Sequence, residues 1–383
     1  MLDKDRLDKA CLQLIQGEEL LRSILVENKG QLCWEVHQVP EDISIPVIDL
    51  SAYQEAAKEK IFEAVIKNQF SKKHNESGIL YQIFVVKWSL TSNYLAIPID
   101  HAIFDGMSID IIKDKILTYY QQPGTGISQE SINLYSNYVE QINKGPQNTT
   151  TEEIITKYQL EEFNYYKEVV EDFITKQGTK KAEVTDFSLP FDKEIKRENS
   201  WELSFYLFTK ALAEHLGITK VPVKLINFGR RYEDQDYYQT VGEFLDIIPV
   251  LVNVDEADIT EIVEDIQKKI DYAVRHNINF VTLADKEDKI NKLIMPQTIN
   301  ELDIIYNYQG FVTKEEQRIA KLFGIESDNT INQGSKLSSI EGDVFYDSEL
   351  TIRLISTLAD YTSTLEETIN ELVEDKMKIS KPL

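Results

Sequence analysis

The spacing of hydrophobic residues changes several times along the chain between a helical period and a strand period. In residues 4–27, Leu7, Cys11 and Leu14 recur every three or four positions, which predicts an amphipathic helix. In residues 94–101 the side chains alternate between two faces, which predicts a strand. The same criteria predict helices at 53–70, 108–122 and about 150–176, and strands at 31–39 and 79–90.

The second half of the chain continues this alternation. The pattern there predicts helices at 200–216, about 257–276, 283–294 and about 362–377, and strands at 220–227, 241–254, 301–308 and 338–355. Helices that alternate with strands, some of them in hairpin-like pairs, are typical of an α/β protein with mixed sheets and helices packed on them.

A polar stretch divides the chain into two parts. Residues 177–200 are charged and weakly periodic, so we interpret them as a crossover linker between two lobes. The 383 residues are sufficient for two domains of ordinary size. The predicted N-terminal lobe covers residues 1–176, and the predicted C-terminal lobe covers residues 201–383.

The composition narrows the range of partners. The chain has 41 basic and 65 acidic residues and a formal net charge of −24. This charge argues against nucleic acid or an anionic membrane as the main partner, since both require a dense cationic surface. No apolar run approaches the roughly 20 residues of a membrane span, and the charged start lacks the apolar region of a signal peptide. Cys11 and Cys33 are too few for a disulfide framework and have no metal-ligand spacing. We therefore expect a cytoplasmic protein without a metal or a bound cofactor.

One histidine stands where a strand ends and a turn begins. His101 follows the predicted strand, and alternation puts its imidazole on the same face as Ile97 and Ile99. An imidazole has an ordinary pKa of about 6.5, so it can accept a proton from an amine or hydroxyl that attacks an acyl group. His101 is therefore a candidate general base.

The residues after His101 predict a tight turn into a helix. Asp105 can hold this turn by pairing with an arginine from elsewhere in the chain, and Gly106 allows a positive φ or the close approach of another backbone. Ser108 is the predicted N-cap of the helix at 108–122.

A structural role for the same residues is the alternative. A lone histidine before a turn is more often structural than catalytic, and Asp-Gly is a common turn sequence. No phosphate-binding loop, dinucleotide fingerprint, zinc spacing or nucleophilic Ser or Cys motif is visible. The spacing alone leaves both roles open.

Four segments of the chain resemble the condensation domains of nonribosomal peptide synthetases, which belong to the chloramphenicol-acetyltransferase-like acyltransferases. Residues 100–108, DHAIFDGMS, resemble the HHxxxDGxS signature of these domains. Residues 227–252 resemble the segment in which a Gly-Arg pair precedes V-G-x-F, and residues 303–311 resemble the F-N-Y-Q-G strand. Residues 2–25 resemble the first long helix. The order of the segments agrees, so the resemblance covers nearly the whole chain.

This resemblance implies a fold, a reaction and a set of partners. It implies two acetyltransferase-like lobes that form a V-shaped pseudo-dimer with a tunnel between them. It implies donor and acceptor carrier proteins, each presenting its substrate on a phosphopantetheine arm. The implied reaction joins an acyl thioester to an amine or hydroxyl in nonribosomal peptide or hybrid polyketide biosynthesis. The implied protein is a monomer or a part of a larger synthetase.

The resemblance also implies a role for particular residues. His101 matches the histidine assigned to catalysis, and Gly106 matches the glycine whose backbone lines the acyl site. Asp105 matches the aspartate that holds the motif by a salt bridge. Arg230 is the implied partner of this aspartate, with Arg231 as the second choice.

Two departures from the family pattern keep alternatives open. Asp100 replaces the first histidine of the signature, a residue that the resemblance makes structural. The same segment also satisfies the DxxxxDxxS signature of heterocyclization domains, but those domains lack the histidine, and residues 306–311 offer no Thr-Ser pair. The start of the chain is shorter than in the family, and this feature together with Asp100 favours the other alternative, a catalytically inactive platform that docks carriers or tailoring enzymes.

Overall fold

The chain folds into two compact units. The computed structural model describes residues 2–62, 64–65, 78–124, 134–177, 179–191, 196–232, 235–254, 259–297, 302–313, 338–358 and 365–373. Unit 1 comprises Met1–Asn143 and Phe228–Leu245, and unit 2 comprises Lys144–Asn227 and Asp246–Leu383. This division differs from the expected boundaries, because residues 144–176 belong to the second unit and Phe228–Leu245 belongs to the first. Hydrophobic periodicity identifies local elements, but it does not reveal which body an element joins.

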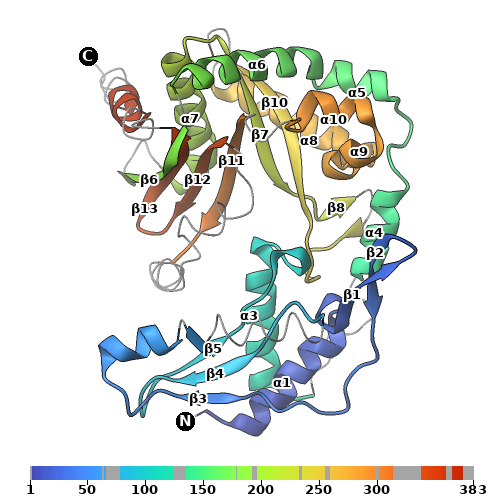
Figure 1. Ribbon diagram of the computed structural model, residues 1–383, viewed down its shortest axis with the longest axis vertical. Helices are drawn as coiled ribbons and strands as arrows, with labels where there is room; N and C mark the ends of the chain where they lie inside the picture. Colours follow the sequence, from blue (N-terminus) through green and yellow to red (C-terminus); the bar gives the residue numbers. More distant parts are fainter. Residues whose placement is uncertain are drawn as a thin grey trace. The chain divides into compact units, whose positions relative to one another are not determined.

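Unit 1 is built on a three-stranded sheet with helices packed against it (Figure 1). The strands are β3 (Val47–Asp49), β4 (Phe84–Lys87) and β5 (Asn93–Ala96), in that order, with β3 parallel and β5 antiparallel to β4. Helices α1 (Lys4–Gly17) and α3 (Gly106–Gln121) pack against each other. Their apolar faces and the residues around β4 form one core, which includes Leu7, Cys11, Leu14, Ile83, Val85, Ile111, Ile112 and Ile116.

A short turn and the first strand of a β-hairpin replace the second half of the helix expected at 4–27, and the second strand of the hairpin lies within the strand expected at 31–39. Helix α1 ends at Gly17, and three shorter elements follow: η1 (Leu20–Arg22), β1 (Ser23–Asn28) and β2 (Gln31–Val36). Lys29 and Gly30 both have a positive φ, as a two-residue turn between antiparallel strands requires. The helix prediction was therefore wrong beyond Gly17, because the apolar residues of β1 are also consistent with a strand.

Unit 2 is built on a six-stranded mixed sheet. The strand order is β10-β7-β11-β12-β13-β6. Their bounds are β6 (Thr179–Pro190), β7 (Lys220–Phe228), β10 (Leu245–Asn253), β11 (Leu302–Phe311), β12 (Ser338–Tyr346) and β13 (Glu349–Leu358). Strand β11 is parallel to β7 and β12, whereas β12 with β13 and β13 with β6 are antiparallel. The predicted α/β class with mixed sheets is confirmed.

The linker expected at 177–200 is largely strand β6, at one edge of this sheet. Phe187 and Leu189 are buried in the core of unit 2, whereas Val184 is exposed. Arg353 of the neighbouring strand β13 makes two hydrogen bonds of 2.7 Å to Asp186. An edge strand tolerates many charged residues, so its composition resembles that of a linker.

Helices pack against the sheet of unit 2 (Figure 1). They are α5 (Thr151–Lys157), α6 (Leu160–Gln177), α7 (Ser200–Leu216), α8 (Ile259–Arg275), α9 (Phe280–Lys286) and α10 (Asp288–Ile294). The single helix expected at about 150–176 is broken at Gln159, which has a φ of 54°. Phe205, Phe208 and Leu212 of α7 form a common core with Tyr306 and Val344 of the sheet.

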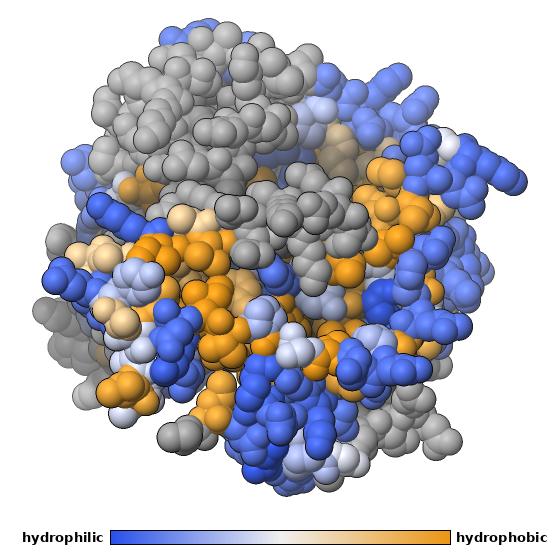
Figure 2. All heavy atoms as spheres, turned by 60° about the horizontal axis from the view of Figure 1, so that its bottom comes forward, coloured by the Kyte–Doolittle hydropathy of each residue, from blue (hydrophilic) through white to orange (hydrophobic). Residues whose placement is uncertain are grey.

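The surface of unit 1 carries several exposed hydrophobic side chains. Leu32, Val47 and Leu90 are all more than half exposed. Figure 2 shows one face of the molecule, on which hydrophobic patches are interrupted by hydrophilic residues. Among the described helices, none has the length and apolar character needed to cross a bilayer.

Candidate active site

His101 lies in a short 3₁₀ turn at the end of a strand-like segment. Backbone bonds pair this segment with residues 80–82, including a bond of 2.7 Å from Asp100 N to Leu80 O. The turn η2 (His101–Ile103) then begins, and the Asp100 carboxylate accepts a hydrogen bond of 2.9 Å from Ala102 N. Asp100 therefore caps the turn. The expected strand alternation does not extend to His101, whose side chain is 64% exposed, while Ile99 packs against the core.

Asp105 begins helix α3 and forms a reciprocal cap with Ser108. The Asp105 carboxylate accepts a hydrogen bond of 2.9 Å from Ser108 N, and Asp105 N donates to the Ser108 hydroxyl at 3.4 Å. The N-cap is thus Asp105 rather than Ser108, because the helix begins two residues earlier than the sequence pattern predicted. Ser108 is the third helical residue and supplies the other half of the capping box.

Arg230 and Asp105 form a fully buried ion pair within unit 1. Arg230 Nη2 donates to Asp105 Oδ1 at 2.5 Å and to the Ser108 hydroxyl at 3.0 Å, and both charged side chains are 0% exposed. Arg230 Nη1 donates to the carbonyls of Tyr237 and Thr240 at 2.8 and 2.6 Å. A buried charge requires this kind of compensation, since an unpaired one costs several kcal/mol. The second choice, Arg231, lies exposed in the short strand β8 (Arg231–Tyr232).

Glu243 is the acid that contacts the imidazole, and sequence reasoning missed it. His101 Nδ1 lies 2.6 Å from Glu243 Oε2, and the Glu243 side chain is 26% exposed. The hydrogen bond to Glu243 raises the pKa of His101 above its ordinary value of 6.5, although burial acts in the opposite direction. With Nδ1 bound to a carboxylate, Nε2 is the ring nitrogen left to exchange a proton with a substrate.

Neighbouring groups hold Glu243 in place. Its Oε1 accepts a hydrogen bond of 2.8 Å from Leu245 N, and its backbone carbonyl accepts one of 2.9 Å from the Tyr135 hydroxyl. The preceding residue, Gly242, has no space for a side chain, because a Cβ would lie 2.3 Å from the Tyr135 ring. Gly242 N also lies 3.1 Å from the Ser108 hydroxyl. The residues around the buried pair thus also position Glu243.

A second buried ion pair fixes the same segment to unit 1. Lys115 of α3 pairs with Glu18, and Lys115 Nζ also donates to Gln239 O at 2.5 Å. The other oxygen of Glu18 accepts a hydrogen bond of 2.9 Å from Val241 N. Residues 239–242 are therefore anchored to both α1 and α3 through buried groups.

Aromatic side chains pack beside Arg230. Phe244 lies under its guanidinium at 4.2 Å, a cation–π geometry. Tyr232 and Tyr237 are buried with Tyr138 of α4 (Tyr135–Asn143) in the same cluster. Tyr232 and Tyr237 are therefore interior residues of unit 1.

Gly106 is the first residue of α3 and does not adopt a positive φ. A Cβ at this position would meet the Phe228 ring at 3.7 Å, which is an ordinary contact. Its backbone N–H belongs to the first turn of a helix, where N–H groups lack intrahelical partners.

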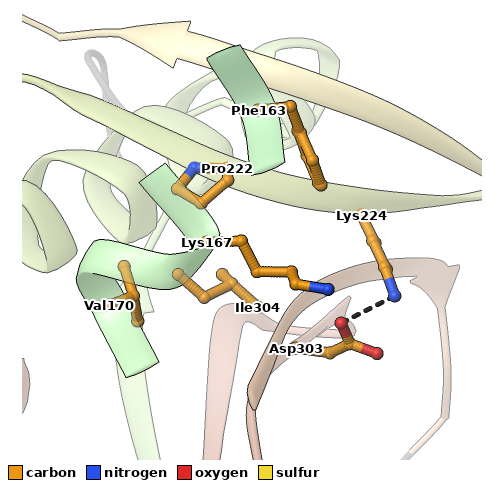
Figure 3. A pocket seen from close by; sticks show the side chains of 7 residues that line it. All are labelled: Phe163, Lys167, Val170, Pro222, Lys224, Asp303 and Ile304. Carbon is orange, nitrogen blue, oxygen red and sulfur yellow. Dashed lines mark ion pairs between the residues drawn. The ribbon is translucent and has the colours of Figure 1, made fainter. Parts of the chain in front are cut away.

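Two other cavities are distinct from these residues. An open cavity of about 600 Å³ in unit 1 is lined mainly by apolar residues, including Ile15, Leu21, Ile43 and Ile79, and His101 is not part of it. A narrow pocket in unit 2 contains Lys167, Lys224 and Asp303 (Figure 3). Lys224 Nζ pairs with Asp303 at 2.6 Å, and the pocket does not admit a water molecule, so its charges are structural. In the described part of the chain, no group of three or more His, Cys, Asp or Glu residues could hold a metal ion.

Comparison with known proteins identifies the family. Residues 1–374 match the condensation domain family. The chain belongs to this family. Condensation domains are typically acyltransferases that act on substrates bound to carrier proteins.

Individual relatives are distant. Surfactin synthase subunit 1 of Bacillus subtilis (strain 168) is 22% identical over 341 residues, which cover 80% of this chain and 9% of that protein. The chain therefore spans about a tenth of the length of this curated relative. The epimerization domain from the third module of tyrocidine synthetase B has a TM-score of 0.61 at 14% identity, covering 97% of this chain and 87% of that one. SgcC5 from Streptomyces globisporus has a TM-score of 0.59 at 12% identity, covering 97% and 90% of the two chains. These structural similarities support the fold.

Proposed function

We propose that this condensation domain is an active acyltransferase that moves an acyl group from a thioester to a nucleophilic acceptor. A donor carrier protein would present the acyl group as a thioester on its phosphopantetheine arm. The acceptor would be an amine or a hydroxyl on a second carrier. The observation that carries this proposal is the exposed His101 ring, whose Nδ1 is bound to Glu243 at 2.6 Å.

His101 would act as the general base in this reaction. Nε2 takes a proton from the acceptor as it attacks, and the Glu243 carboxylate stabilises the imidazolium that forms. The backbone N–H of Gly106 would stabilise negative charge on the carbonyl oxygen of the tetrahedral intermediate. Collapse of this intermediate breaks the C–S bond, and the departing thiolate takes up the proton that His101 received from the acceptor. The tethering of both substrates contributes by holding them in the reactive geometry.

The remaining site residues would support this centre without touching the substrate. Asp100 caps the turn that carries His101, so its replacement of the histidine in the family signature leaves the imidazole exposed. Asp105 and Arg230 would hold the turn against Phe228–Leu245. The retained histidine disfavours heterocyclization chemistry. The paired imidazole disfavours an inactive platform, because a platform has no use for a carboxylate-bound, exposed ring.

The test is an intact-mass assay of candidate acylated carrier proteins, with loaded acceptor carriers, in the presence of the wild type and His101→Ala. The variant should lower product formation about 10²–10⁴-fold, as expected for loss of a general base. His37→Ala is the matched control, because His37 is another exposed histidine of unit 1 that pairs with a glutamate, at 3.2 Å. It should retain wild-type activity. Equal product formation by wild type and His101→Ala would contradict the proposed role.

A further inference from the structure

We propose that the acceptor of this domain is a hydroxyl group, so that the product is an ester rather than an amide. This inference rests on the proposed acyl transfer and deepens it by naming the acceptor class. It follows from the Glu243–His101 pair, the fixed geometry of Glu243 and the different requirements of the two nucleophiles.

The Glu243 carboxylate is held as a dedicated partner of the imidazole. One of its oxygens accepts the Leu245 N–H at 2.8 Å, which leaves the other aimed at His101 Nδ1 at 2.6 Å. The backbone before Glu243 is also fixed, because Gly242 is packed against the Tyr135 ring. By comparison, the pair between His37 and Glu35 joins two exposed side chains two residues apart at 3.2 Å.

A hydroxyl acceptor depends on such a base more strongly than an amine does. An α-amino group has a pKa of about 8, so about a tenth of it is already neutral at pH 7, and this fraction can attack without losing a proton first. Neutral water has a pKa of about 15.7, and a hydroxyl group similarly must lose its proton as the new bond forms. An imidazole backed by a carboxylate is the arrangement that removes a hydroxyl proton in Ser-His-Asp enzymes.

The step balances without a further reactant. The hydroxyl oxygen forms a bond to the thioester carbonyl carbon while its proton moves to His101 Nε2. The tetrahedral intermediate then expels the thiolate, which takes the proton from Nε2. The products are an ester and a thiol, and His101 returns to its neutral form.

The experiment compares two acceptors that differ only in the nucleophile. Acyl-pantetheine donors of two to ten carbons are incubated with lactoyl-pantetheine or alanyl-pantetheine, and the ester and amide products are measured by mass spectrometry above the His101→Ala background. We expect the ester to exceed the amide at least 10-fold. Glu243→Gln should lower ester formation about 10²–10⁴-fold, by analogy with loss of the carboxylate in a catalytic triad. Glu243→Asp should recover part of this loss.

The opposite preference would overturn the inference. Preferential amide formation that survives Glu243→Gln would show that the acceptor is an amine while acyl transfer itself stands. Absence of both products across the donor series would instead overturn the proposed function and the inference with it. A Glu243→Gln variant with wild-type ester formation would show that the pair is only structural.

Discussion

His101 and Asp105, four residues apart in one turn, each pair with a residue of Phe228–Leu245. One pair is exposed to solvent and the other is buried. His101 contacts Glu243 with an imidazole that is 64% exposed, whereas Asp105 contacts Arg230 with both side chains 0% exposed. Both pairs connect the turn at residues 100–108 with Phe228–Leu245 inside unit 1.

This difference in exposure distinguishes the proposed catalytic role of His101 from the structural role of Asp105 and Arg230. Neither water nor substrate can reach a buried pair, and the hydrogen bonds that it makes are to other groups of the protein. An exposed imidazole with one nitrogen committed leaves the other free to exchange protons. In the proposed reaction, residues 100–108 therefore supply both the reactive imidazole and the buried residues that hold Glu243 within its reach.

The largest expected effect is on stability, from breaking the buried pair. Asp105→Ala should lower the free energy of unfolding by about 3–5 kcal/mol, because it leaves the Arg230 guanidinium without its buried counter-ion and removes the cap of α3. Denaturant unfolding followed by circular dichroism measures this loss.

The double variant Asp105→Ala with Arg230→Met is the control. If the two charges act as a pair, it should be less destabilised than the sum of the single variants. Additive losses, or an unchanged unfolding curve for Asp105→Ala, would contradict the pairing.

Substitution of two glycines, Gly242 and Gly106, should have smaller effects on stability, and it tests whether the backbone before Glu243 is rigidly held. Gly242→Ala should destabilise the protein by about 1–3 kcal/mol and displace Glu243, because the new methyl would lie 2.3 Å from the Tyr135 ring. Gly106→Ala should change stability by no more than about 1 kcal/mol, since Gly106 has an ordinary φ and its new methyl would lie 3.7 Å from the nearest atom of Phe228.

Activity then distinguishes the roles of these two glycines. If the Gly106 backbone lines the acyl site, Gly106→Ala should slow acyl transfer while the unfolding curve stays in place. Equal loss of stability in the two variants would show that the frame around Glu243 is not as rigid as the contacts indicate.

Much of the local structure follows from the sequence. Helix α7 and strand β7 lie within one residue of their predicted bounds, because each has a strong apolar period. Strand β1 was missed because Leu20 and Leu21 continue the helical spacing of α1, whereas β2 lies within the strand predicted at 31–39. Strand β6 was missed because an edge strand carries charges that also suit a linker.

The site could be predicted only in part, for a physical reason. The residues at 100–108 are contiguous, so the turn and the start of a helix are visible locally, although the pattern predicted Ser108 as the N-cap in place of Asp105. Glu243 leaves no such signal, since it is 142 residues from His101 in sequence and meets it only when Phe228–Leu245 folds against residues 100–108. Glu243 can be seen in the sequence between Gly242 and Phe244, but no neighbouring residue indicates that it pairs with His101.

The most direct test of the account is the dependence of kcat/KM on pH for the wild type and Glu243→Gln. The base must be neutral to act, and Glu243 raises the pKa of His101, so activity in the wild type should rise with pH through a midpoint above 6.5. Removing the carboxylate charge should move this midpoint to lower pH and lower the plateau rate. The same midpoint in both proteins would contradict the claim that Glu243 and His101 act together.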